Sequence, residues 1–340
     1  MSASKASEKV IVVRLPNWVG DVCMVMPSLA LLAQTGCKLM VCGKPFAQPL
    51  LHSLPDFRFI AITGSILKDA RLLRHELGRI HADINGLLFP DSLSSALAFK
   101  LAGIDSAGYR DDGRSLLLRW PVSKPAIPGH AVLKWYGLTC QAIRHWQLPV
   151  QQPIPDVPAP YAYEPGTQDI ERVDEVLRKH NLHADEPYVL IAPTATGLHK
   201  GQIKVWSGFS DLTRSLLDQG YRVLICPPAH ERHQAQQAAP DAEMLDPLSL
   251  GAFAQLARKA RLVVCNDSGV SHIAALVGAR QITLFGVTDP VHTRPWSSHA
   301  ICLGKLGAWP DTQTVLEHCL NAMQKPKTED SPVRMAVSGT

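Results

Sequence analysis

In segment 263–278, VVCNDSGVSHIAALVG, an apolar run is followed by a cluster of small polar residues. Asn266, Asp267 and Ser268 are residue types that begin helices, and Gly269 permits a tight turn. A helix that starts here exposes backbone N–H groups and a positive dipole end, which bind phosphate. A plain helix cap is the alternative, but one capping residue does not account for four followed by His272. Because a carboxylate repels phosphate, we expect Asp267 to accept hydrogen bonds from sugar hydroxyls.

Segment 12–27, VVRLPNWVGDVCMVMP, leaves an earlier apolar run in a similar way. Gly20 and Asp21 stand at the first turn, and Pro27 kinks or restarts the helix that follows. Asp21 is either the N-cap of that helix or, at the edge of a ligand cleft, a general base. A general base of this kind contributes about 10²–10⁴ in rate.

A third candidate site is APTATGLHKGQIKVW, which follows another apolar run. Its hydroxyl and ammonium groups, on Thr194, Thr196, Lys200 and Lys204, suit a pyrophosphate, which needs both donors and positive charge. The alternative is a solvated basic loop. Either Lys200 or Lys204 can be the residue that contacts the diphosphate.

Glu231, in CPPAHERHQ at 226–234, is the fourth candidate, because acidic residues after a strand often bind a ribose hydroxyl. The surrounding histidines are three positions apart, one short of the zinc-protease pattern H-E-x-x-H. No G-x-G-x-x-G follows the first apolar run, which argues against a dinucleotide-dependent dehydrogenase. No D-x-D metal-binding pair is present either.

Composition limits the classes of protein that the chain can be. Its 340 residues, 46% of them apolar, fit two globular domains. We find no signal peptide and no apolar run of about 18 residues, so we expect a cytoplasmic protein. The net charge of +4 is too small to indicate a nucleic-acid partner. The eight cysteines form no C-x-x-C pair, which favours reduced thiols over disulfides or a metal site.

Short apolar runs of strand length alternate with amphipathic segments of helix length, a pattern typical of parallel sheets covered by helices. The alternation occurs twice and predicts an α/β protein with two doubly wound, Rossmann-like domains. The first half is expected to contain strands 10–15, 38–42, 59–62 and 84–89 and helices near 27–34, 66–80 and 92–102. The second half is expected to contain strands 188–192, 222–226, 243–245, 262–265 and 281–285 and helices near 168–181, 207–219, 249–260, 271–277 and 312–324.

Six prolines lie between residues 148 and 166. Because proline continues neither a helix nor a central strand, we expect a linker at 149–167 between domains 9–148 and 168–325. The polar tail 326–340 is expected to be disordered. Two such domains would face a central cleft, and open parallel sheets bind ligands beyond the carboxyl ends of their strands. The strand-to-helix turns are therefore where functional residues are expected.

Basic residues in the first half indicate an anionic second ligand. Arg71 and Arg74 lie in an expected helix, and Arg110 and Arg114 follow a fifth strand. Guanidinium groups bind phosphate or carboxylate well, although a solvated helix face is an equally good interpretation. A lipid-linked ligand would imply loose contact with the inner leaflet of the membrane, because no dedicated anchor is seen.

Four stretches stand in order along the chain: Gly20-Asp21 with Pro27, Lys204 with Trp206, NDSGVSH at 266–272, and LFGVTDP at 284–290. Together they resemble the ADP-heptose:lipopolysaccharide heptosyltransferase family. The resemblance extends from about Val10 to Met323. Its most specific part is 266–290, where N-D-S-G-x-x-H-x-A-A and F-G-x-T-D-P occur together.

The resemblance implies a GT-B glycosyltransferase whose N-terminal domain binds the lipopolysaccharide inner core and whose C-terminal domain binds ADP-L-glycero-D-manno-heptose. It makes Asp21 the general base and Lys204 the cation that neutralises the departing diphosphate. It also implies that Ser268 and Gly269 bind the diphosphate through backbone N–H groups, and that Asp267 contacts the heptose. The family inverts the anomeric centre without a tightly bound metal or cofactor, because fixed positive charge can stabilise the leaving group.

The chain departs from the family pattern in the third site. Pro193-Thr194-Ala195 replaces the usual P-G-A, and Trp206-Ser207 replaces Trp-Pro. The inserted TGLHKGQI keeps Lys200 as a rival of Lys204. The alternatives are a transferase for another nucleotide sugar or a protein acceptor, and a non-catalytic nucleotide-sugar-binding protein. We expect a monomer.

Overall fold

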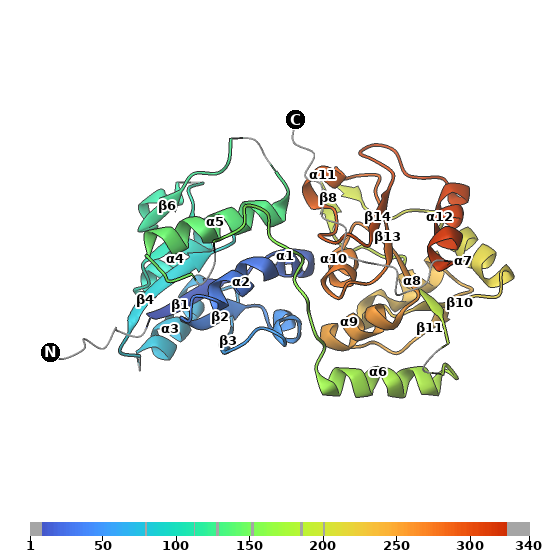
Figure 1. Cartoon of the computed structure of the whole chain (residues 1–340), viewed down its shortest axis with the longest axis horizontal. Coiled ribbons are helices and arrows are strands. Elements are labelled where there is room, and N and C mark those ends of the chain that lie inside the picture. The colour runs from blue at the N-terminus through green and yellow to red at the C-terminus, as the bar shows by residue number, and fades with distance from the viewer. Residues whose placement is uncertain are drawn as a thin grey trace. The chain divides into compact units, whose positions relative to one another are not determined.

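The computed structural model describes residues 9–78, 80–111, 113–126, 129–150, 153–183, 186–199 and 201–324. The chain divides into two compact units between Tyr161 and Ala162 (Figure 1). This division lies inside the segment 149–167. The predicted tail 326–340 lies outside the described residues.

The described residues of the first unit form one sheet of six parallel strands, in the order β3-β2-β1-β4-β5-β6. The strands are β1 Lys9–Arg14, β2 Lys38–Gly43, β3 Phe57–Ala61, β4 Asp83–Leu88, β5 Ser106–Tyr109 and β6 Trp120–Val122. The central strand β1 is buried almost throughout because helices cover both faces of a parallel sheet. Continuous apolar runs, rather than alternating ones, result from this burial.

Within the described part of this unit, five α-helices cover the sheet: α1 Val19–Met24, α2 Met26–Ala33, α3 Ile66–Leu77, α4 Leu93–Ala102 and α5 Ala131–His145. Helix α2 packs against α5, and α3 packs against α4. Pro27 stands in the first turn of α2, where its missing N–H costs nothing, so the predicted restart of the helix at Pro27 is confirmed.

The described residues of the second unit repeat this architecture, with strand order β11-β10-β7-β12-β13-β14. The strands are β7 Tyr188–Ala192, β10 Arg222–Ile225, β11 Glu243–Met244, β12 Leu262–Asn266, β13 Gln281–Leu284 and β14 Ala300–Leu303. The helices are α6 Thr167–Lys179, α7 Phe209–Asp218, α8 Arg232–Ala238, α9 Leu250–Lys259, α10 Gly269–Leu276, α11 Pro290–Thr293 and α12 Thr312–Gln324. The predicted doubly wound α/β class is therefore confirmed in each half.

Several elements were not expected from local patterns. The first sheet includes β6, whose three residues contain Pro121, and the second ends at β14. Both are edge strands, where proline and partial exposure are tolerated. The inserted segment, expected to be a loop, forms a short antiparallel hairpin between β8 Leu198–His199 and β9 Gln202–Ile203. Tertiary pairing rather than local propensity decides such short strands.

All strands of each six-stranded sheet are parallel, but the order in which the chain adds them reverses at the centre of the sheet. The chain moves outward from β1 through β2 to β3 and then returns to β4, which pairs with the other side of β1. In the second sheet the same reversal occurs where β12 pairs with β7. Ligands of doubly wound proteins bind at such reversal points, beyond the carboxyl ends of the strands.

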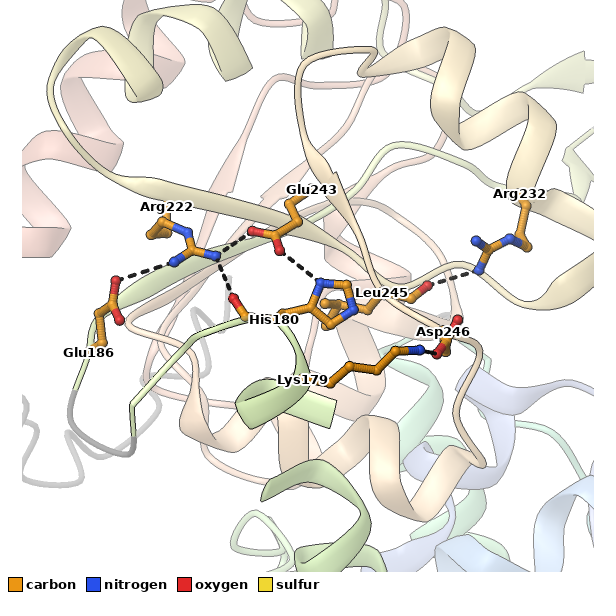
Figure 2. A network of polar contacts seen from close by, with 8 residues as sticks. All are labelled: Lys179, His180, Glu186, Arg222, Arg232, Glu243, Leu245 and Asp246. Carbon is orange, nitrogen blue, oxygen red and sulfur yellow. Dashed lines mark hydrogen bonds and ion pairs between the residues drawn. The ribbon is translucent and has the colours of Figure 1, made fainter. Parts of the chain in front are cut away.

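A polar network connects the end of α6 to the edge strand β11 of the second sheet and to its neighbour β10 (Figure 2). His180 lies 2.7 Å from Glu243, Arg222 also pairs with Glu243, and Lys179 pairs with Asp246 at 2.7 Å. Burial would raise the pKa of Glu243, but hydrogen bonds from Arg222 and His180 outweigh it and lower that pKa. Arg222 and Glu243 begin β10 and β11, so most of this network holds the amino edge, which leaves the carboxyl edge for a ligand.

Candidate functional site

The turns after β7 and β10 bring together two residues predicted to bind a donor. Thr194 lies two residues beyond β7, and Glu231 lies in the 3₁₀ turn Ala229–Glu231 beyond β10. The Thr194 hydroxyl donates a hydrogen bond of 2.5 Å to Oε2 of Glu231. Because β7 and β10 are neighbours, 37 positions of sequence separation reduce to direct contact. Thr194 is buried and the Glu231 side chain is 13% exposed.

The turns after β12 and β13 hold a buried carboxylate between a cation and a hydroxyl. Oδ2 of Asp267 accepts a 2.6 Å hydrogen bond from the Thr288 hydroxyl. The same oxygen lies 3.6 Å from Nζ of Lys204. The Asp267 side chain is 5% exposed and that of Lys204 is 20% exposed. The structure thus brings the predicted Lys204 and Asp267 together, with Lys204 still accessible to a ligand.

Asn266 positions this cation. Its side-chain oxygen accepts a 2.9 Å hydrogen bond from the backbone N–H of Trp206, and its side-chain nitrogen donates to Ala192. The Trp206 ring is buried, donates to the carbonyl of Pro310 and packs edge-on against Phe209. These contacts fix the backbone at Trp206, two residues after Lys204, and so restrict where the Lys204 side chain can lie.

Helix α10 begins directly after Asp267. Ser268 is its N-cap, yet its side chain makes no capping hydrogen bond, and its buried Oγ has no partner among the described residues. The alternative of a plain helix cap at 266–269 is therefore not supported, because Asn266 and Asp267 bond elsewhere. In the first turn of α10, the Ser271 N–H donates to the carbonyl of Ser268 at 3.2 Å. The N–H groups of Gly269 and Val270 come before it, where a helix offers no acceptor of its own, so this helix start suits an anion.

His272, on α10, is a buried histidine whose Nδ1 lacks a hydrogen-bond partner among the described residues. Burial lowers the pKa of His272 to about 4; the nearby Asp267 opposes the shift and Lys204 adds to it. The ring is consequently neutral at physiological pH. A neutral imidazole near Lys204 avoids repulsion between two cations.

His272 is expected to make stability depend on pH. Between pH 6.5 and 4 the unfolded chain binds a proton at this residue and the folded chain does not, so the free energy of unfolding falls as pH falls. With the pKa lowered from 6.5 to about 4, the loss approaches about 3 kcal/mol. Urea unfolding at several pH values measures it, and a His272→Gln variant should lose this part of the slope.

His318→Gln serves as the control for this measurement, since His318 is a half-buried histidine on α12 that hydrogen-bonds to Thr314. The control is expected to keep the slope of the unchanged protein. If His272→Gln shows the same dependence on pH as the unchanged protein, the buried neutral state of His272 is wrong.

In the first unit, Asp21 is the third residue of α1 and half-buried. The N-cap position belongs to Trp18, so the alternative that Asp21 is the N-cap is wrong. The preceding loop is ordered by the Arg14 side chain, which donates to the carbonyl of Leu15 and, at 2.7 Å, to Asn17. Asp21 therefore lies on a fixed turn beyond the carboxyl end of β1.

The arginines predicted to bind an acceptor differ in their location and in their exposure to solvent. Arg110 is exposed directly after β5, at the carboxyl edge. Arg71 is exposed on α3, and Arg74 donates to the carbonyl of Leu101 near the end of α4, away from that edge. Arg114 is fully buried and donates to the carbonyls of Pro90 and Ser92, so it is unavailable to a ligand. The sequence analysis assigned all four arginines to one anionic ligand, because the charge of a residue does not reveal whether its side chain is buried.

Two further residues predicted to bind the donor are Thr196 and Lys200. Thr196 is exposed beyond β7, and Lys200 lies outside the described residues. No group of three or more His, Cys, Asp or Glu side chains in the described ranges could hold a metal ion. Among the same residues, no helix has both the length and the apolar character that crossing a bilayer requires.

Sequence reasoning missed two residues of this site. Thr288, in LFGVTDP, was quoted without a role, and Asn266 was considered only as a helix-capping type. A buried Asn in a strand end has no apolar reason to be there, which is a signal that it satisfies neighbouring backbone groups. The side-chain oxygen and nitrogen of Asn266 do so at Trp206 and Ala192.

Comparison with known proteins agrees with this architecture. Residues 70–321 match the model of glycosyltransferase family 9 (heptosyltransferase). Lipooligosaccharide heptosyltransferase 2 of Haemophilus influenzae is 28% identical over 308 residues, covering 84% of this chain and 85% of that protein. Lipopolysaccharide heptosyltransferase 2 of Escherichia coli K12 is 25% identical over 314 residues, covering 84% and 85%.

A solved structure shows the same fold. It is that of the E. coli ADP-heptose LPS heptosyltransferase II, with a TM-score of 0.72, 22% sequence identity, and coverage of 92% of this chain and 98% of that one. The two doubly wound sheets, the polar turns beyond their strands and the family match over most of the chain lead to one conclusion. This chain belongs to glycosyltransferase family 9, the heptosyltransferase family.

Proposed function

We propose that this protein is an inverting glycosyltransferase that moves L-glycero-D-manno-heptose from ADP-heptose to a lipopolysaccharide inner-core sugar. Family membership supports a glycosyltransferase. The relatives named heptosyltransferase 2 support a lipopolysaccharide-type acceptor, and the similar E. coli structure is described as an ADP-heptose enzyme.

The observation that carries the proposal is the convergence of Lys204, Asp267 and Thr288 beside the start of α10, at the reversal point of the second sheet. In the proposal, a diphosphate lies against the amides of Ser268 and Gly269 and draws the Lys204 ammonium toward it. Fixed positive charge at that position stabilises the negative charge that develops on the leaving group.

In the proposed reaction, Asp21 accepts the proton of the acceptor hydroxyl. The hydroxyl oxygen attacks the anomeric carbon of heptose, and the bond from that carbon to the diphosphate breaks. Its electron pair leaves with ADP, whose charge Lys204 neutralises. A single displacement of this kind inverts the anomeric configuration. The contact of Thr194 with Glu231 supports a ribose site, with Glu231 accepting from a ribose hydroxyl.

Incubation of the protein with ADP-heptose and a core oligosaccharide that lacks heptose tests the proposal. We expect mass spectrometry to show addition of one heptose, and NMR to show an anomeric configuration opposite to that of the donor. Parallel reactions with UDP-sugars separate the alternative of another nucleotide sugar. Binding of ADP-heptose without transfer to any core acceptor would instead favour a non-catalytic binding protein or a protein acceptor.

The remaining expectations belong to the same proposal. We expect a monomer that works in the cytoplasm and needs no bound metal. Peripheral contact with the inner face of the membrane would fit a lipid-linked, anionic acceptor. Each of these stays a prediction.

A further inference from the structure

Trp18 is an exposed tryptophan next to the proposed general base. Trp18 is 69% exposed, whereas the other six tryptophans are buried or half-buried. Trp135, Trp146, Trp206 and Trp296 are buried. We infer that Trp18 is the surface on which a sugar ring of the acceptor stacks; this rests on the proposed function and adds an acceptor-positioning residue to it.

The backbone that carries Trp18 is held on both sides. The N–H of Leu15 donates to Cys42 at 2.8 Å, and the Arg14 guanidinium bonds to Leu15 and Asn17. After the loop, the N–H of Val22 donates to the carbonyl of Trp18 at 3.0 Å, which starts α1. The indole is thus exposed on an ordered turn. Ordering the turn in advance removes the entropy cost that a mobile loop would have on binding.

Trp18 does not contribute to its own turn through its side chain. As the N-cap of α1 it makes no side-chain capping hydrogen bond, a role for which Ser, Thr, Asp or Asn is preferred. Leaving a large indole in water forgoes the stabilisation that burial gives to an aromatic side chain. Local folding therefore does not explain a tryptophan at this position, and a ligand does.

The position of Trp18 in the chain indicates that its ligand is the acceptor rather than the donor. Trp18 is the N-cap and Asp21 is the third residue of α1, the position from which a side chain can reach back toward the N-cap residue. Figure 1 shows α1 following β1 in the first unit. The groups proposed for the donor, Lys204 and Asp267, belong to the second unit. A ring held on Trp18 would present its hydroxyl to Asp21.

The chemistry suits a sugar ring. One face of a pyranose carries C–H groups with slight positive charge, and the indole face is negative, so the two attract while both lose contact with water. Hydroxyl groups at the ring edge remain free to react. A lipid chain would also cover an indole, so the test uses an acceptor without lipid.

The test compares the unchanged protein with Trp18→Ala, Trp18→Phe and Leu67→Ala. Leu67, 60% exposed near the start of α3, is the matched control for loss of an exposed apolar side chain. Binding of lipid-free core oligosaccharide is measured by calorimetry, and KM for acceptor and for ADP-heptose by transfer assays. We expect Trp18→Ala to weaken acceptor binding about tenfold, from the size of aromatic stacking energies. Trp18→Phe should recover most of the binding.

The KM for ADP-heptose should not change in any of these variants. Unchanged acceptor affinity in Trp18→Ala, or a loss equal to that in Leu67→Ala, overturns the inference. Binding of the oligosaccharide that depends on Trp18, without heptose transfer by the unchanged protein, would contradict the proposed function while the stacking role stands. Loss in both Trp18→Ala and Trp18→Phe, with intact circular dichroism, would show that the indole N–H rather than the ring face binds.

Discussion

Asp21→Asn is expected to lower kcat by about 10²–10⁴, the usual contribution of a general base, while ADP-heptose binds with unchanged affinity. The substitution keeps the shape of the side chain and removes its ability to accept the proton of the acceptor. Asp21 is half-buried in a helix of the first unit, so the donor groups of the second unit keep their contacts. Single-turnover transfer assays and calorimetry with ADP-heptose measure the two quantities.

Asp83→Asn is the matched control for the loss of one carboxylate. Asp83 is exposed at the first residue of β4, at the amino edge of the same sheet, so kcat should not change. Asp91 is the rival base, because it follows the carboxyl end of β4, the neighbour of β1. Its Oδ2 lies 2.8 Å from Lys134 and 3.1 Å from Lys124. Normal turnover in Asp21→Asn together with loss in Asp91→Asn would move the proposed base to Asp91.

Lys204→Met is expected to lower kcat/KM for ADP-heptose by about 10²–10³, comparable to removing one oxyanion-hole donor. Methionine keeps the apolar stem and removes the charge that stabilises the leaving diphosphate. It also leaves Asp267 with the Thr288 hydroxyl but without its cation, so the free energy of unfolding should decrease. Steady-state kinetics and urea unfolding separate the catalytic loss from the loss of stability.

Lys259→Met provides the comparison for this variant. Lys259 on α9 pairs with Asp174 at 2.6 Å and is 24% exposed, close to the 20% of Lys204. The Lys259→Met variant should lose stability but keep the kcat/KM of the unchanged protein. Adding Asp267→Asn to Lys204→Met should restore stability without restoring activity. If Lys204→Met turns over normally and Lys200→Met does not, Lys200 is the residue that contacts the diphosphate.

Local sequence patterns were sufficient for most of the fold. The apolar runs at 10–15 and 262–265 are uninterrupted because parallel strands in a doubly wound sheet are covered on both faces. The strands β1 and β12 could therefore be predicted from these runs. The edge strands β6 and β14 were not predicted, although the edge strands β3 and β11 were. In β6 only Val122 of three residues is buried, and no residue of β14 is buried, so neither segment contains a buried apolar run. Pro121 in β6 is tolerated because the strand lies at an edge.

The candidate site divides in the same way. Residue types alone identified Asp267, Lys204, Thr194 and Glu231 as polar groups in turns after apolar runs. That Thr194 contacts Glu231, and Lys204 faces Asp267, follows only from strand order. Two turns become neighbours when their strands pair, and no local pattern states which strands pair.

The sequence by itself determined that this protein has two doubly wound halves, which turns carry polar chemistry, and which family those turns resemble. Only the tertiary structure decided that Arg114 is buried, that Thr288 holds Asp267, and that Trp18 remains in solvent at the N-cap of α1. The physical reason is that periodicity records the average environment of an element. Burial and contact of one side chain depend on neighbours that are distant in the chain.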